Sequence, residues 1–179
     1  MAKEVKTNAM RILEANSIEY RELILDIKEA LDGVTCANML GLELESTFKT
    51  LVTVGKSGEH YVFVVPVAEK LSLKKAAAAV GEKNVEMIPM KDLLKIAGYV
   101  HGGCSPIGMK KVFTTVIDET AILFDKIVFS GGKIGYLKNN NFDEKLVENL
   151  IFEAKRISTN ELAAGFVGGI KEIKHYEDI

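Results

Sequence analysis

The chain has 179 residues, of which 47% are hydrophobic and 27% are charged. These values are ordinary for a globular protein that buries a core, and the length favours one domain. The net charge of −2 argues against a protein that binds nucleic acid through its overall charge alone. It is compatible with a local basic patch.

The cysteine content and the first residues indicate a cytoplasmic protein. Cys36 and Cys104 are too few for a disulfide framework, and free thiols suit a reducing compartment. Residues 1–7 lack the apolar core of a signal peptide, and no apolar run approaches the roughly 20 residues that span a bilayer. His60 and His175 stand apart from other metal-binding side chains, so the sequence predicts no metal site and indicates no cofactor.

The first part of the chain alternates helical and strand patterns. Apolar residues at helical spacing predict a first helix, and Gly41 ends a second one. The run Thr47 to Val54 is rich in β-branched residues, and a Gly-containing turn separates it from a second such run, which predicts a hairpin. The expected elements are a helix over 3–15, a strand over 18–25, a helix over 33–40, and strands over 47–54 and 60–65.

The second part of the chain also alternates helical and strand patterns. Glycines end two short helices, and Gly131-Gly132 separates two strands, while 118–120 could cap or turn the chain. The expected elements are helices over 70–80 and 91–97, strands over 112–117, 126–130 and 133–138, and helices over 142–156 and 161–166. Because the strands come in hairpins, the pattern predicts an α+β fold with a mixed or antiparallel sheet.

Residues 98–111 carry the densest group of special residues in the chain. The segment holds four glycines and one proline together with a His, a Cys, a Ser and two lysines. Consecutive backbone N–H groups in such a loop can form a concavity that binds an anion or an oxyanion, whereas an ordinary tight turn is the simpler interpretation. The spacing does not match a P-loop.

Three other features admit both a functional and a purely structural interpretation. Lys49, on a predicted strand next to Leu51, either extends its ammonium to solvent or orients a carbonyl or phosphate. His101 and Cys104 lie only three residues apart, which argues against a nucleophilic pair. Ser130 either forms a plain turn or lines the same pocket as the loop, to which Lys133 could add charge.

Taken together and in this order, these residues resemble one known family. The chain is similar, from about Leu13 to Leu137, to the YbaK group of the YbaK and prolyl-tRNA-synthetase-associated editing domains. The combination of a strand lysine with a later Gly-Gly-x-Ser-Pro-x-Gly loop carries the resemblance. The matching segments are Phe48–Leu51, Gly98–Val100, Gly102–Gly108 with Lys110–Lys111, and Phe129–Gly132.

The resemblance implies a fold, an activity and a site. The implied fold is a compact, mostly antiparallel, barrel-like sheet with flanking helices, in a domain over 1–157 that precedes a tail over 158–179. The implied activity is the removal of cysteine from tRNA(Pro) in trans, through attack of the cysteinyl thiol on its own ester. The matching residues are Lys49 as the essential lysine and, lining the substrate pocket, Thr50, Gly102, Gly103, Cys104, Ser105, Pro106, Gly108, Ser130 and Gly131.

The near-neutral charge indicates that the chain binds tRNA weakly by itself. The resemblance implies that a complex with tRNA and prolyl-tRNA synthetase supplies the missing affinity. Two alternatives stay open: hydrolysis of Ala-tRNA(Pro) by a bound water, and a protein that binds a nucleotide or small anion without turnover.

The chain also departs from the family pattern. Leu25 stands near the position of a tyrosine in some relatives, His101 replaces other residues, and the tail beyond Arg156 has no counterpart.

Overall fold

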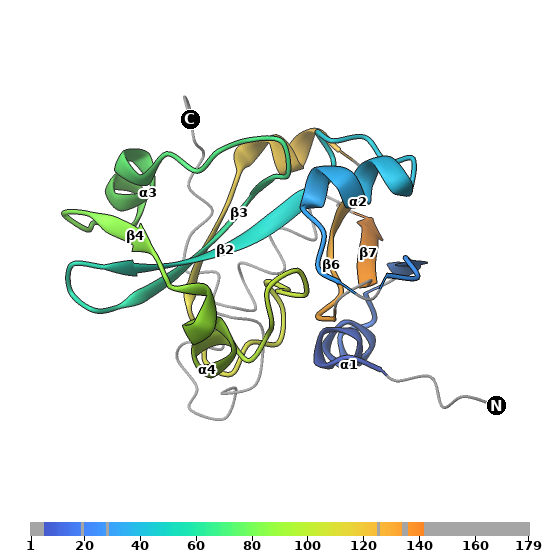
Figure 1. Cartoon of the computed structure of the whole chain (residues 1–179), viewed down its shortest axis with the longest axis horizontal. Helices are drawn as coiled ribbons and strands as arrows, with labels where there is room; N and C mark the ends of the chain where they lie inside the picture. Colours follow the sequence, from blue (N-terminus) through green and yellow to red (C-terminus); the bar gives the residue numbers. More distant parts are fainter. Residues whose placement is uncertain (1–5, 19, 28, 125, 134–135, 142–179) are drawn as a thin grey trace.

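The structure is a computed structural model that describes residues 6–18, 20–27, 29–124, 126–133 and 136–141 (Figure 1). The helices predicted over 142–156 and 161–166, and the tail over 158–179, lie outside the described residues. Within the described ranges, no helix is both long and apolar enough to cross a membrane.

A four-stranded sheet is built on the predicted central hairpin, which the structure confirms. Strands β2 (Phe48–Gly55) and β3 (His60–Pro66) pair antiparallel, with Lys49 opposite Val65. The tight turn between them contains Gly58 at φ +88°, a conformation that favours glycine. Strand β4 (Val85–Met87) pairs with β2, and strand β5 (Thr114–Ile117) pairs parallel to β3, which gives the order β4-β2-β3-β5.

A second, three-stranded antiparallel sheet has the order β1-β7-β6. Its strands are β1 (Tyr20–Ile24), β6 (Lys126–Ser130) and β7 (Tyr136–Asn141). The two sheets meet at one isolated parallel bridge between Thr47 and Val128, where the Val128 N–H donates to the Ser46 carbonyl at 2.9 Å.

The expected barrel is therefore wrong, whereas the α+β class with flanking helices is confirmed. The pairing of the described strands does not close, because β4 and β5 form the two edges of one sheet and β1 and β6 those of the other. The four-stranded sheet is also mixed rather than antiparallel throughout. The chain between β3 and β5 passes through α3, β4 and α4 and returns to the same end of the sheet, as a parallel pair requires.

The helices have the caps that the sequence pattern favours. Side chains of Thr7, Asp32 and Ser72 accept hydrogen bonds from the first turns of α1, α2 and α3, which stabilises each helix start. The helices are α1 (Asn8–Ala15), α2 (Gly33–Met39), α3 (Leu73–Val80) and α4 (Leu93–Ala97), with 3₁₀ turns η1 (Met90–Asp92) and η2 (Glu119–Leu123). The short strand β4 was not among the predicted elements, whereas the expected cap or turn over 118–120 is confirmed by Asp118, which caps η2.

Both faces of the central hairpin are covered, so its side chains are placed by packing on two sides. On one face, Phe48 belongs to a cluster with α1, and Val52 belongs to a cluster with α4 and Tyr99. On the other face, Phe63 and Val65 pack against α3, with Leu51 at the margin of that cluster. Figure 1 shows α2 beside the end of β2 that lies next to β6, and this end carries Lys49.

Candidate active site

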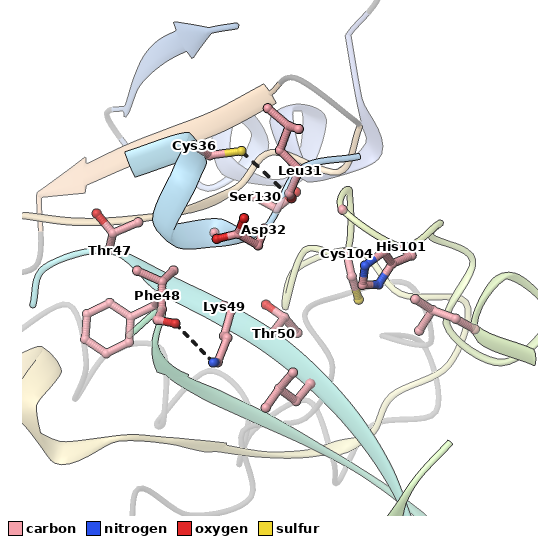
Figure 2. Close-up of a pocket in the computed structure, with 15 residues that line it drawn as sticks. Leu31, Asp32, Cys36, Thr47, Phe48, Lys49, Thr50, His101, Cys104 and Ser130 are labelled. Atoms are coloured by element: carbon pink, nitrogen blue, oxygen red, sulfur yellow. Dashed lines mark hydrogen bonds between the residues drawn. The ribbon is translucent and has the colours of Figure 1, made fainter. Parts of the chain in front are cut away.

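A cavity of about 280 Å³ lies where the start of β2 meets α2, the 98–111 loop and the end of β6 (Figure 2). Its volume is near the lower end of the roughly 300–1,000 Å³ that is typical of ligand pockets, so it suits a small group rather than a whole nucleotide. The lining residues are Leu31, Asp32, Gly33, Cys36, Thr47, Phe48, Lys49, Thr50, Leu51, Val67, Leu93, His101, Gly102, Cys104 and Ser130.

Lys49 places a half-buried ammonium at this cavity. Its Nζ donates a hydrogen bond to the Val67 carbonyl oxygen at 3.1 Å, drawn as a dashed line in Figure 2. Burial lowers the pKa of Lys49, and the negative charge of Glu69 opposes that effect. In the part of the chain that the structure describes, no carboxylate lies within ion-pair distance of this ammonium. The ammonium therefore has donors left for a ligand.

Thr50 contributes a buried hydroxyl without a partner. Its Oγ1 is shielded from solvent and has no hydrogen-bond partner among the described residues. Buried polar atoms almost always have a partner, so this orphaned hydroxyl stands out on a residue that lines the cavity. Lys49 and Thr50 both line the cavity, although neighbouring residues of a strand point to opposite faces of the sheet.

The 98–111 loop reaches the cavity with only part of its length. Gly102 and Cys104 line it, together with His101, whose side chain is exposed. Gly102 has φ +83°, a conformation in which a side chain would be strained. The Gly103 N–H donates to the Val100 carbonyl at 3.0 Å, so this N–H closes the turn and does not face a ligand.

The other predicted loop residues hold the loop in place. Ser105 is fully buried, and its hydroxyl accepts from the Ile107 N–H at 3.2 Å. The Gly108 carbonyl accepts from the Asn8 side chain at 2.9 Å, which ties the loop to α1. Pro106, like Gly103, Ser105 and Gly108, is absent from the cavity lining.

Tyr99 is a buried residue of this loop, and it packs close to two glycines. Its hydroxyl donates to the Ile107 carbonyl at 2.5 Å. A Cβ on Gly108 would lie 3.0 Å from this hydroxyl, and one on Gly132 would lie 2.8 Å from the ring. Burial raises the pKa of Tyr99, so the phenol keeps its proton and its donor role.

Neither cysteine at the cavity has the character of a nucleophile. Cys104 is buried, and burial raises the pKa of its thiol to about 12. Burial, assisted by the charge of Asp32, also raises the pKa of Cys36. A catalytic thiol needs the opposite shift, because the thiolate is the nucleophile. The described residues also contain no group of three His, Cys, Asp or Glu side chains placed to hold a metal.

In the turn after β6, as in the loop, only some of the predicted site residues line the cavity. Ser130 lines the cavity, and its hydroxyl accepts from the Gly132 N–H at 3.4 Å. Gly131 does not line it, and its carbonyl accepts from the Thr7 hydroxyl at 2.6 Å in a buried contact. Gly131 therefore anchors the start of α1 next to the site.

The wall formed by α2 was not among the predicted site residues. Leu31, Asp32, Gly33 and Cys36 line the cavity from the start of this helix, and Val67 does so from the segment after β3. The close approach is allowed by Gly33, since a Cβ there would lie 2.7 Å from a Val67 methyl group. The Asp-Gly pair at a predicted helix start was the signal available in the sequence.

Comparison with known proteins identifies a family and a relative that this chain resembles in sequence. The sequence profile of a family described as "Aminoacyl-tRNA editing domain" matches residues 28–146. A protein of Enterococcus faecalis (strain ATCC 700802 / V583), named "Putative Cys-tRNA(Pro)/Cys-tRNA(Cys) deacylase EbsC", is 47% identical over 131 residues, which are 73% of this chain and 80% of the relative.

Two solved structures share the fold. One, called hypothetical protein APE2540, has a TM-score of 0.69 and 23% sequence identity, over 79% of this chain and 93% of its own. The other, called "a putative trans-editing enzyme for prolyl tRNA synthetase", has a TM-score of 0.64 and 24% identity, over 77% of this chain and 88% of its own.

Proposed function

The chain belongs to the family of aminoacyl-tRNA editing domains, and on that basis we propose that it deacylates mischarged Cys-tRNA(Pro) in trans. The substrate class is supported by the relative that is 47% identical over 131 residues, whose name specifies Cys-tRNA(Pro) and Cys-tRNA(Cys). The observation that carries the proposal is the pair formed by the Lys49 ammonium and the partnerless Thr50 hydroxyl on one small cavity.

This pair provides donors for an ester group. The aminoacyl carbonyl oxygen accepts from Lys49 and Thr50, and both donors strengthen their bonds as negative charge develops on that oxygen. Gly102 and Ser130 also line the cavity and limit the space that the acyl group can occupy. Holding the ester in this way favours the conformation in which an intramolecular attack on its carbonyl carbon can occur.

The reacting sulfur belongs to the substrate in this mechanism. The cysteinyl thiol attacks the ester carbonyl carbon, so that a C–S bond forms and the C–O bond to the tRNA ribose breaks. The thiol proton ends on the ribose oxygen, and the products are a cyclic thiolactone and tRNA with a free hydroxyl. The raised pKa of Cys104 supports this assignment, because that thiol stays protonated at neutral pH and lines the pocket instead.

The rest of the tRNA must bind outside the cavity. A space of about 280 Å³ suits the aminoacyl group and not the nucleotides behind it. With a net charge of −2 the chain attracts phosphates weakly, which supports a complex with prolyl-tRNA synthetase as the source of affinity.

The test is a deacylation assay with three substrates. Wild-type protein should release tRNA from Cys-tRNA(Pro) but not from Ala-tRNA(Pro) or from tRNA(Pro) charged with S-methylcysteine, since neither of these has a free thiol. Mass spectrometry of the quenched reaction should detect the thiolactone. Release from all three substrates would instead indicate hydrolysis by a bound water, and release from none would refute the proposed activity.

Lys49→Ala should lower the rate of release by about 100- to 1,000-fold, which is typical of losing one oxyanion donor. The matched control is Lys56→Ala, because Lys56 is exposed on the hairpin turn and does not line the cavity. A circular dichroism melt of both variants checks that the fold is kept. Equal rates for the two variants would contradict the role of Lys49.

A further inference from the structure

We propose that the Asp32 carboxylate binds the protonated α-amino group of the aminoacyl ester, an inference that rests on the proposed function. It gives the cavity a selectivity for free aminoacyl groups over N-acylated ones. The evidence comes from the position of Asp32, its hydrogen bonds and the charges around it.

Asp32 is the only carboxylate among the described residues that line the cavity. It precedes α2 and lies at the exposed rim, whereas Lys49 comes from β2 (Figure 2). An aminoacyl ester carries a cationic amine one carbon away from its carbonyl carbon. A cavity lined by one carboxylate and one ammonium offers an acceptor for that amine and a donor for the carbonyl oxygen.

The carboxylate is held in one orientation by Thr35. Oδ1 accepts from the Thr35 N–H at 3.0 Å, and Oδ2 accepts from the Thr35 hydroxyl at 2.5 Å. An ionised carboxylate has about four acceptor positions, so the two bonds from Thr35 do not use all of them. The same bonds from Thr35 lower the pKa of Asp32, which keeps the carboxylate charged at neutral pH.

No protein cation competes for this carboxylate in the described ranges. No ion pair within 4.0 Å includes Asp32, and the Lys49 ammonium is engaged with the Val67 carbonyl. The charge that acts on Lys49 is that of Glu69 and not that of Asp32. Asp32 therefore offers a negative charge to a ligand, and a peptide-like α-amino group, with a pKa of about 7.7–8.0, is mostly protonated at pH 7.

The experiment measures binding without turnover. The probes are 3′-deoxy-3′-(cysteinylamido)adenosine, in which an amide replaces the labile ester, and the same molecule with an acetylated α-amine. Wild-type protein should bind the free amine on the order of fivefold more tightly than the acetylated probe, the effect expected of one partly exposed ion pair. Isothermal titration calorimetry or NMR titration gives both dissociation constants.

Asp32→Asn should abolish this preference. Asparagine and serine are both good N-cap residues, so Asp32→Asn and Asp32→Ser keep the start of α2 while they remove the charge. Glu45→Gln is the matched control, because Glu45 is exposed, lies between α2 and β2 and does not line the cavity. A thermal melt of each variant verifies folding.

The outcomes separate this inference from the proposed function. Wild-type protein that binds both probes equally, or neither, overturns the role of Asp32, as does a preference that survives in both Asp32 variants. A preference lost only in the Asp32 variants supports it, even if Cys-tRNA(Pro) is not deacylated, in which case the proposed function alone fails.

Discussion

Replacing Thr50 by valine should stabilise the protein and impair deacylation at the same time. The two side chains have nearly the same shape, and the change replaces the hydroxyl by a methyl group. In the folded protein this hydroxyl is buried without a partner, whereas in the unfolded chain it is hydrated. The native state therefore carries a desolvation cost that valine does not.

The size of the effect follows from the burial of this residue. An unsatisfied buried hydroxyl costs roughly 1–3 kcal/mol in protein mutational data. The Thr50 side chain as a whole is only partly buried, so the lower end of that range applies. We expect the free energy of unfolding to rise by about 1 kcal/mol, which corresponds to about 2–4 °C in Tm for a chain of this length.

Thr53→Val is the matched control on the same strand. Thr53 is fully buried and does not line the cavity, and its hydroxyl donates to the Tyr61 carbonyl at 3.3 Å. Removing that bond should lower the free energy of unfolding by about 0.5–1.5 kcal/mol and leave deacylation unchanged. Urea denaturation measures the two free energies, and the Cys-tRNA(Pro) assay measures the two rates.

The decisive result is that the free energy of unfolding should rise in Thr50→Val and fall in Thr53→Val. If Thr50→Val destabilises the protein as much as Thr53→Val, then the Thr50 hydroxyl has a partner in the folded protein and the reasoning is refuted. If Thr50→Val is stabilising but fully active, the hydroxyl is orphaned and does not bind the substrate.

Two further predictions concern the ionisation of cavity residues. Because burial raises the pKa of Cys104 to about 12, its thiol should react with iodoacetamide at pH 8 far more slowly in the folded protein than in urea. Peptide mass spectrometry measures the extent of modification, and rapid modification of Cys104 in the folded protein would contradict this prediction. Cys104→Ser should retain deacylation. Because burial lowers the pKa of Lys49, its ammonium loses its proton at a lower pH than an ordinary lysine does. Activity that depends on the charged form should therefore decline with rising pH earlier in wild-type protein than in Lys49→Arg, whose guanidinium stays charged, and identical alkaline limbs in the two pH–rate profiles would contradict that.

The local elements were predictable from the sequence because their signals are local. Alternating β-branched residues and a Gly-containing turn predicted the β2–β3 hairpin, and the structure confirms it. Gly41, Gly81 and Gly98 end helices in the left-handed conformation that glycine adopts readily. The three-residue strand β4 carries too short a pattern to be recognised, and it forms because it pairs with β2.

The arrangement of the strands was decided by the tertiary structure. The parallel pair of β3 and β5 joins segments about fifty residues apart, and no local pattern specifies which edge a strand joins. The same holds for the separation into two sheets, which in the described part of the chain are joined by the isolated bridge between Thr47 and Val128. The resemblance pointed to a barrel-like sheet, and the pairing of the described strands forms two sheets that do not close into a barrel.

The candidate site was likewise predictable in part from the sequence and decided in part by the tertiary structure. Lys49 and the 98–111 loop were recognisable because chemically distinctive residues gather there in an order typical of the family. Which of these residues face the cavity was decided by packing: Gly102 and Ser130 line it, whereas Ser105 and Gly131 are used to hold the loop and α1.

Asp32 shows the limit of a one-dimensional pattern most clearly. In the sequence it is an ordinary N-cap before a short helix, and the structure confirms that role through Thr35. Its place on the cavity exists only because Gly33 lets α2 approach Val67, a contact between segments more than thirty residues apart. Residue chemistry and local conformation are properties of neighbours in the chain, whereas a binding site is made by neighbours in space.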